Sequence, residues 1–481
     1  MAVSAATAAY IAMATSVAAA AVSAAMMMSA KGKNNGDISD SGTSITRKGK
    51  DDPKIVPFGK SIIPATKVFT NVNDNNRRWL TEIFSLGHGP LKSINQIYID
   101  EQPLFGVADK DRSEQWFNSS VFKEGFWNLQ VGVRRGLKRN ATWDLMVTHG
   151  DGQWTYDHRG DATGTISMLI ERPDPKNSGS DKHRILSDKF QVEALVEGIK
   201  VIDPRVDPQL TGWNDSDNRY WIANGKESYR NPALCLLTYL ADQEFGFGIN
   251  PKFIDLNSFI NTANWCEANK ITMDGFVDQG DTFGNIVKQF VAAFNGYLFL
   301  ENGRIKIMPD TVSPVMFNVT EDDMHKDITI SNNKGDYFNT VKVNFQNRDT
   351  EYNKDMLVLP KDALTDPTIK EDGRIFEKTI DCTLSTDPAY AKLVANMELK
   401  RAKLCRRGAV LHLNNLNLPL KVGYVFTIEH ALYELDKNTK WRITSIENSL
   451  DKDTLISKIE AEEYDERVYD TTTYDDLITH D

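Results

Sequence analysis

The residue types that most often carry chemistry are dispersed along this sequence. The four cysteines, Cys235, Cys266, Cys382 and Cys405, include no CxxC pair. Zinc ribbons and thioredoxin-like redox sites need closely spaced thiols, so the sequence supports neither. Cys235, Cys266 and Cys405 fall within helical patterns, and we interpret them as buried free thiols. A chain of 481 residues can bury a full core without disulfides, and we expect it to fold in a reducing cytoplasm.

Neither the histidines nor the carboxylates form a catalytic or metal-binding pattern. The sequence has no GxGxxG, P-loop, HExxH or GxSxG motif. Asp215-Ser-Asp217 begins like a calcium loop, but no glycine or terminal glutamate follows at the required spacing. Glu321-Asp322-Asp323 offers acid–base groups and fits a solvated turn or helix cap as well. No two of the eight histidines stand at i and i+4: His88, His149, His158, His183, His325, His412, His430 and His480. We therefore predict no catalytic, cofactor-binding or metal-binding residue, and no enzyme.

Four aromatic residues lie near one another in the sequence, namely Trp213, Tyr220, Trp221 and Tyr229. Such side chains can form a sugar-binding platform, although an interface or a local core explains them as well. They leave one enzymatic alternative open, a polysaccharide or peptidoglycan hydrolase in which carboxylates such as Asp217 act beside the aromatic cluster.

The composition is that of a globular protein with an acidic surface. Hydrophobic residues make up 41% and charged residues 26%, which argues against disorder, collagen-like repeats and a polytopic membrane protein. The net charge is −11. An acidic chain is unsuited to wrapping duplex DNA but suits a surface that nucleic acid slides past.

The first 30 residues form an uncharged, alanine-rich segment. Alanine is the best helix former, so residues 1–30 are predicted to form a long hydrophobic helix. The first lysine is Lys31, after the apolar stretch, whereas a secretory signal begins with basic residues. Small residues allow close helix packing, so a helix enclosed in an assembly and one inserted in a membrane both remain open. Residues 31–53 are rich in Gly, Ser, Asn and Asp and are predicted to be a flexible linker.

The remaining chain shows short strands and a few helices with clear ends. Alternating or β-branched runs predict strands at Leu91–Asp100, Ile166–Glu171, Phe190–Val196, Asn339–Phe345, Ala409–Leu413, Tyr424–Glu429, Trp441–Ile446 and Leu455–Ala461. Capping residues predict helices from Asn231-Pro232 to before Gly246, over Asp255–Lys270, from Asp281 or Thr282 to near Gly296, and from Asp387-Pro388 to about Arg406. Between them, Asn302-Gly303 predicts a type I′ hairpin joining Tyr297–Leu300 to Arg304–Met308.

The last predicted helix ends in a basic cluster of Lys400, Arg401, Lys403 and Arg406, favourable against the helix dipole. We expect these residues to form a solvated face, with contact to an acidic partner as the alternative. Together the patterns predict a β-rich α+β fold. We divide it into a β-rich region at 54–200, an α/β region at 201–310, a β-rich domain with one long helix at 311–463, and an acidic tail at 464–481.

Eight segments, in order, resemble the hub part of the lambda-type tail-tip proteins, the host specificity protein J family of long-tailed phages. The most specific is YRNPALCLLTYLADQEFGFGI (Tyr229–Ile249), with its Asn-Pro-Ala helix opening and Gly-aromatic-Gly exit. GIKVIDPR (Gly198–Arg205) is similar to a family strand that ends in Tyr-Asp-Pro-Arg, with Ile202 in place of the tyrosine. The others are Asp51–Thr70, Thr81–Leu104, Gly280–Ile307, Phe338–Tyr352, the helix from Asp387, and Leu418–His430. The resemblance spans residues 51–465.

The resemblance implies tail-tube-like β-barrel or sandwich domains that assemble as a homotrimeric hub closing the distal end of a phage tail. It implies a virion protein at the tail tip, assembled in the host cytoplasm. Its partners would be the distal tail protein ring, the tape-measure protein and a tail fibre or spike, and DNA would pass through the hub without specific binding. Residues 1–30 are expected to lie in the trimer lumen and to contact the host membrane on DNA ejection. Longer family members continue into receptor-binding modules, whereas this chain ends soon after Tyr464. We therefore expect a separate fibre to recognise the receptor.

Overall fold

A computed structural model describes residues 53–73, 79–104, 116–119, 129–171, 190–332, 337–362, 366–414, 418–451 and 454–470. The predicted helix at 1–30, nearly all of the linker and most of the acidic tail lie outside these residues. The chain divides into two compact units. Of the described residues, those from 53 to 248 and from 272 to 282 belong to the N-terminal unit, and those from 249 to 271 and from 283 to 470 belong to the C-terminal unit. The finer domain boundaries stay a prediction.

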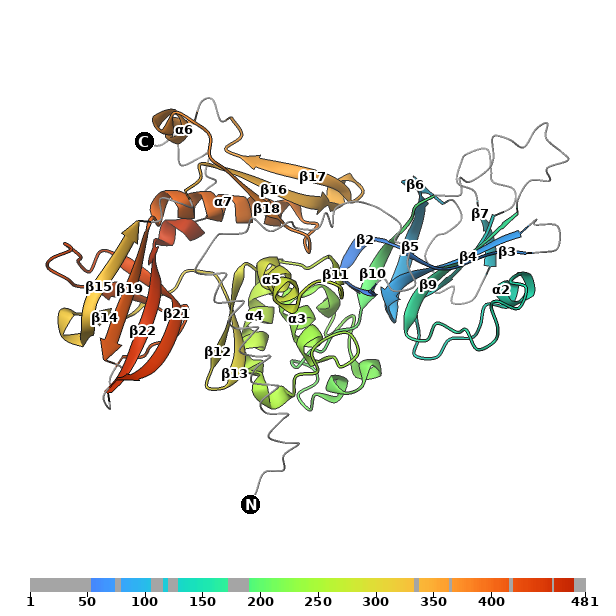
Figure 1. Ribbon diagram of the computed structural model, residues 1–481, viewed down its shortest axis with the longest axis horizontal. Coiled ribbons are helices and arrows are strands. Elements are labelled where there is room, and N and C mark those ends of the chain that lie inside the picture. Colours follow the sequence, from blue (N-terminus) through green and yellow to red (C-terminus); the bar gives the residue numbers. More distant parts are fainter. Residues whose placement is uncertain are drawn as a thin grey trace, which may run out of the picture. The chain divides into compact units, whose positions relative to one another are not determined.

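The N-terminal unit is built on antiparallel sheets (Figure 1). A five-stranded sheet has the order β3 (Thr66–Val72), β4 (Trp79–His88), β9 (Thr163–Glu171), β8 (Leu129–Arg134) and β7 (Trp116–Ser119). A four-stranded sheet has the order β2 (Lys60–Pro64), β10 (Val192–Ile199), β5 (Leu91–Ile99) and β6 (Gln102–Pro103). The strands β1 (Ile55–Phe58) and β11 (Gly275–Asp278) form a separate pair, and the helices are α2 (Asp144–His149) and α3 (Pro232–Ala241).

Helix α3 shows how a local signal becomes a buried element. The Asn231 side chain accepts from the N–H groups of Ala233 and Leu234, and Pro232 occupies the first helical turn, as predicted. All ten residues of α3 are buried. A helix that is hydrophobic all round belongs inside a core, so α3 is the central helix of this unit.

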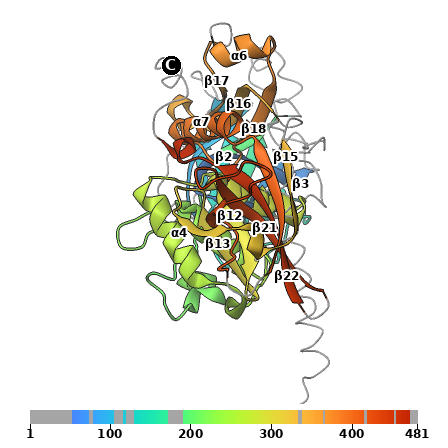
Figure 2. The same cartoon turned by 90° about the vertical axis from the view of Figure 1, so that its left-hand side faces the viewer.

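The C-terminal unit contains a six-stranded sheet of order β14 (Val315–Val319), β20 (Val425–Ile428), β21 (Lys440–Asp451), β22 (Thr454–Tyr464), β19 (Arg407–Asn414) and β15 (Met324–Asn332). The long strands β21 and β22 run side by side as an antiparallel pair (Figure 2). The core of this sheet includes Trp441, Phe426 and Leu411, each fully buried. β14 and β15 each pair with one neighbour, so they are the edge strands of the sheet among the described residues.

A second sheet of this unit packs against its longest helix. The order is β17 (Asn353–Leu359), β16 (Thr340–Asn347) and β18 (Glu377–Asp381). Helix α7 (Pro388–Leu404) places Ala391, Ala395 and Leu399 against Val341 and Val343. Small alanine side chains let the helix approach the sheet closely. The remaining elements are α4 (Leu256–Ala268), α5 (Phe283–Ala293), α6 (Pro367–Asp372) and the hairpin of β12 (Gly296–Glu301) and β13 (Arg304–Pro309).

The predicted β-rich α+β fold is confirmed. Each of the eight predicted strands coincides with or overlaps an observed one, and Asp255 and Asp387 cap α4 and α7 as expected. The hairpin turn has φ values of 51° at Asn302 and 71° at Gly303. Two successive positive φ values define the predicted type I′ turn. No helix in the described part of the chain combines the length and apolarity needed to cross a membrane.

Candidate functional site

The structure places the four cysteines at separate positions as free thiols. Cys235 in α3 and Cys266 in α4 are fully buried, as predicted. The prediction for Cys405 is wrong, because α7 ends at Leu404 and Cys405 is the partly exposed C-cap residue before β19. Burial still raises the pKa of the Cys382 and Cys405 thiols to about 12. Both are therefore protonated and poorly nucleophilic at neutral pH.

The carboxylates singled out in the sequence serve as turn caps. Asp215 accepts the Asp217 N–H at 3.2 Å and lies 3.5 Å from the Lys138 ammonium. Asp323 accepts the Thr320 N–H at 2.9 Å in a capping box. Within the described residues, no group of three or more His, Cys, Asp or Glu side chains could hold a metal ion.

The four clustered aromatics do not share one exposed face. Trp213 and Tyr229 are buried, at 4% and 1% exposure. Tyr220 and Trp221 are half-buried, and the Trp221 indole N–H donates to the Gly198 carbonyl at 3.0 Å. A sugar platform needs open ring faces, so this arrangement matches the alternative of a local core.

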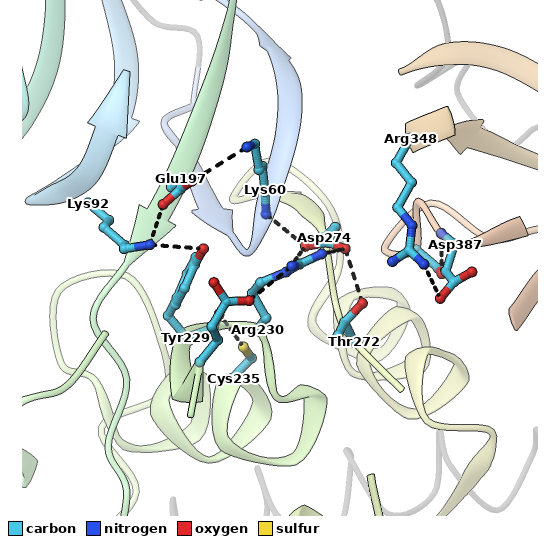
Figure 3. Close-up of polar contacts among 12 residues, drawn as sticks. Lys60, Lys92, Glu197, Tyr229, Arg230, Cys235, Thr272, Asp274, Arg348 and Asp387 are labelled. Atoms are coloured by element: carbon cyan, nitrogen blue, oxygen red, sulfur yellow. Dashed lines mark hydrogen bonds and ion pairs between the residues drawn. The ribbon is translucent and has the colours of Figure 1, made fainter. Parts of the chain in front are cut away.

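Charged side chains gather in the N-terminal unit around Glu197 (Figure 3). The Glu197 carboxylate accepts a hydrogen bond from Lys92 and lies 3.6 Å from the Lys60 ammonium. Burial alone would raise the pKa of Glu197, but the two lysines hold it below its ordinary value. The Lys92 ammonium lies 4.6 Å from the Tyr229 ring centroid, a cation–π contact. Burial raises the pKa of the Tyr229 hydroxyl, which stays neutral.

A second carboxylate, Asp274, accepts hydrogen bonds from three segments (Figure 3). The Arg230 guanidinium donates to it through Nε and Nη2, both at 2.8 Å. The Lys60 backbone N–H donates at 2.8 Å and the Thr272 hydroxyl at 3.2 Å. The Asp274 side chain is fully buried. Both Asp274 oxygens thus accept hydrogen bonds, and the carboxylate joins these segments.

Asp203, in the GIKVIDPR segment, also joins separate parts of the chain through hydrogen bonds. Asp203 accepts from Arg205 Nε at 2.8 Å and Nη2 at 2.7 Å, and from the Ser228 hydroxyl at 2.8 Å. Burial alone would raise the pKa of Asp203, but these hydrogen bonds hold it below its ordinary value. The aspartate and arginine of the Asp-Pro-Arg pattern thus form an ion pair that fixes the loop before α3.

The basic end of α7 corrects a prediction. Lys403 and Arg406 are exposed, but Lys400 is 1% exposed and donates to the Asp470 carbonyl at 2.8 Å. Arg401 bonds Glu398 at 2.7 Å and also pairs with Asp310. The expected solvated face is therefore wrong for Lys400 and Arg401. The helix end instead packs against the C-terminal turn η8 (Glu466–Tyr469) and is joined through Arg401 to Asp310, the residue after β13.

These contacts centre on a group of four residues that we name the Asp310 cluster: Asp310, Arg401, Arg442 and Tyr469. The Asp310 carboxylate pairs with both arginines and accepts the Tyr469 hydroxyl at 2.7 Å. The Arg442 side chain is 1% exposed and the Asp310 side chain 4%. Burial alone would lower the pKa of Arg442, but Asp310 and the neighbouring tyrosine hydroxyls hold it above its ordinary value.

The Asp310 cluster joins four parts of the chain. Asp310 follows β13, Arg401 lies on helix α7, Arg442 on strand β21 and Tyr469 on turn η8. Sequence reasoning missed it. Arg442 alternates along β21 with Trp441 and Ile443, which are both fully buried, and a side chain between two core residues of a strand points to the opposite face, which is often exposed. Here that face is covered, and the buried Arg442 side chain has Asp310 as its partner. A similar pair secures the start of α7, where Arg348 Nη2 lies 2.9 Å from the N-cap carboxylate of Asp387 (Figure 3).

Part of the chain that carries this cluster matches a known protein family. Residues 284–446 match the Phage-tail_3 family model, described as "Putative phage tail protein". This segment is similar to phage tail proteins. It contains the β12–β13 hairpin, α7 and three of the four residues of the Asp310 cluster.

The search of solved structures gives one chain with a similar overall fold and further tail proteins at lower TM-scores. A chain of the virion of a native gene transfer agent particle is 12% identical, with a TM-score of 0.59, and 98% of each chain is covered. A 43 kDa tail protein of prophage MuSo2 from Shewanella oneidensis is 12% identical over 87% of this chain and 100% of that chain, with a TM-score of 0.30. A tail protein from Neisseria meningitidis MC58 is 8% identical over 87% and 98%, with a TM-score of 0.31. No curated protein matches the sequence.

Proposed function

We propose that this chain is a structural protein of a phage-type tail, acting as the homotrimeric hub that closes the distal end of the tail tube and gates DNA ejection. The observation that carries the proposal is the combination of the tail-protein segment at 284–446 with a fold shared, over 98% of both chains, with a virion protein. Its place in the lambda-type family, at the tail tip, is part of the same proposal.

The six-stranded sheet supports assembly with further copies. Its edge strands β14 and β15 carry backbone groups that face no neighbouring strand within the described residues. An open edge is a template for pairing with another chain. On β14, Val315 and Met316 are 41% and 45% exposed. Natural edge strands that stay unpaired are protected by charge or proline, and these two apolar side chains indicate an edge that is covered in the assembly.

The proposed partners follow from this role. The distal tail protein ring and the tape-measure protein would meet the tube side of the hub, and a fibre or spike would meet the other side. DNA would pass through without specific binding, for which a net charge of −11 is suited. Residues 1–30 would lie in the lumen and reach the host membrane on ejection. The buried positions of Trp213 and Tyr229 give no support to the alternative of a polysaccharide hydrolase.

The mass of the purified chain in solution tests the proposal. Native mass spectrometry is expected to give about three times the chain mass of 54.2 kDa. Met316→Lys places a charge on the β14 edge and is expected to reduce the trimer fraction. Leu393→Lys, at a 40% exposed position on α7, is the matched control and should leave the trimer intact. A wild-type chain that stays monomeric at all concentrations would contradict the homotrimer.

A further inference from the structure

The most exposed of the large apolar side chains described is at the tip of the β20–β21 loop. Leu432 is 80% exposed and its neighbour Tyr433 is 42% exposed. An isolated exposed leucine needs no explanation, but the adjacent tyrosine, a residue type enriched in interface hot spots, extends the exposed apolar surface of this turn.

The turn that carries Leu432 is held in one conformation. His430 and Leu435 exchange two backbone hydrogen bonds of 3.1 Å at the base of the turn. Leu435 is 6% exposed and belongs to the core of the six-stranded sheet. The Ala431 N–H donates to the Glu321 carboxylate at 2.9 Å. Because the turn is fixed before any partner binds, binding through it costs little conformational entropy.

Acidic side chains surround this tip. Glu434 and Asp436 are exposed within the turn, and the Glu321 side chain is 55% exposed beside it. The one lysine of the turn, Lys437, lies 3.2 Å from Glu429, which matches its charge. A complementary surface would therefore be an apolar socket with a basic rim.

The N-terminal unit contains a cavity of this character, with a volume of about 250 Å³. Its apolar walls include Ile55, Ile83, Val68 and the two indoles of Trp143 and Trp154. Val68 is 51% exposed, so the cavity reaches the surface. A cavity of about 150 Å³ takes up benzene, so this one is large enough for a leucine side chain.

Lys54 and Arg159 supply positive charge at the rim of this cavity. The Lys54 ammonium donates to the Thr163 hydroxyl at 3.0 Å, and no carboxylate among the described residues pairs with it. The Arg159 side chain is 52% exposed and shares its charge with Asp161 at 3.0 Å. On the wall, the buried Trp154 indole N–H has no acceptor within the described residues. An arriving loop supplies such an acceptor through its backbone carbonyls.

We propose that the Leu432–Tyr433 tip of one copy inserts into the Trp143–Trp154 cavity of a second copy of this chain. The contact rests on the proposed homotrimer. It joins two different surfaces of identical chains, and a contact of this heterologous kind closes into a ring when the rotation between copies permits. The acidic residues around Leu432 would then face Lys54 and Arg159.

A disulfide between two singly substituted copies tests this contact. Full-length Leu432→Cys and Val68→Cys chains are mixed and oxidised, and heterodimers are identified by mass. The native thiols give a low background, because Cys235 and Cys266 are buried and the pKa of Cys382 and Cys405 is about 12. The controls are Leu393→Cys in place of the tip variant, and Ile222→Cys, 52% exposed, in place of the cavity variant.

If the tip of one copy binds the cavity of another, Leu432→Cys mixed with Val68→Cys should form disulfide-linked heterodimers. Both control mixtures should form heterodimers only at the background level. Leu432→Asp is also expected to raise the self-association Kd by about tenfold or more, as removal of an interface anchor does. Since Leu432 is exposed in the single chain, the variant and the wild type should have the same melting temperature at concentrations at which both are monomeric.

The crosslink and the native mass distinguish a failure of the tip–cavity contact from a failure of the proposed hub. A wild-type trimer without the specific crosslink overturns the tip–cavity contact and leaves the hub intact. A monomeric wild-type chain overturns both. A small molecule that stays bound in the native mass spectrum and is released by Val68→Trp, which fills the cavity, would assign the cavity to a ligand and overturn the contact.

Discussion

Removing the Arg442 guanidinium should strongly destabilise the C-terminal unit. Arg442→Met keeps much of the side-chain volume but removes one of the two arginines that pair with the buried Asp310 carboxylate and leaves Arg401 as the other. It also removes hydrogen bonds to the Thr311 carbonyl at 2.7 Å and to the Tyr469 hydroxyl at 2.6 Å. Breaking a buried ion pair on one side costs about 3–5 kcal/mol of unfolding free energy. We expect a loss near the lower end of this range, because both partners are at most 4% exposed but Arg401 still pairs with Asp310.

The matched control is an arginine–aspartate pair at the surface. Arg467 Nη2 lies 2.7 Å from Asp465, but the Arg467 side chain is 67% exposed. Exposed pairs contribute about 0–1 kcal/mol, so Arg467→Met should change the unfolding free energy by no more than that. The two substitutions are chemically identical and differ in burial.

Urea unfolding followed by circular dichroism measures both effects. The Arg442→Met midpoint should fall with little change in slope, since the same surface is exposed on unfolding. Adding Asp310→Asn removes the carboxylate that the two arginines share, and the loss in the double variant should be smaller than the sum of the single losses by about 0.5–3 kcal/mol. An Arg442→Met loss below about 1 kcal/mol, equal to that of Arg467→Met, would refute the reasoning that the Asp310 cluster holds its four elements together.

Three further predictions concern single contacts. Asn231→Ala removes the N-cap of α3, whose side chain accepts from two backbone N–H groups, and should cost about 0.5–2 kcal/mol in urea unfolding, whereas Asn231→Asp should retain most of the stability. Gly303→Ala meets no atom within 4 Å but must hold φ near 71°, so it should lower the thermal midpoint through a strain of about 1–2 kcal/mol. Because the pKa of Asp203 is lowered in the folded state, its ionised carboxylate stabilises the fold above the ordinary aspartate pKa, and this stability is lost as the pH falls through the folded-state pKa. Asp203→Asn should therefore be less stable than the wild type at pH 7, and its unfolding free energy should fall less steeply toward acid pH. An acid dependence equal to that of the wild type would contradict the ionised pair.

Local signals allowed much of the fold to be predicted. The caps at Asn231, Asp255 and Asp387 and the turn at Asn302-Gly303 act within four residues, so a single sequence contains all the information they need. By contrast, β3 was missed as a strand. Its residues are all half-buried or exposed, and no alternating pattern of core residues marks it.

The charge clusters could not be predicted because each depends on residues far apart in the chain. Lys400 and Arg401 have the sequence character of a solvated helix end, and only the packing of α7 against η8 buries them. Asp310 and Arg442 are separated by 132 residues. Nothing in either segment alone specifies that distance, since the two meet only through tertiary structure.

The buried charges and the exposed apolar residues point to the same kind of function. Asp274 and Asp310 are occupied by cations and hydrogen-bond donors from distant segments, so their charge fixes the fold and is not available to a substrate. Exposed apolar features among the described residues include the edge around Met316 and the tip at Leu432, and the tip lies on a fixed turn. Exposed apolar surfaces of this kind are typical of protein–protein contacts. A chain whose ionic groups hold its own elements together, and whose apolar groups face outward at defined positions, has the properties required of a building block in a larger assembly.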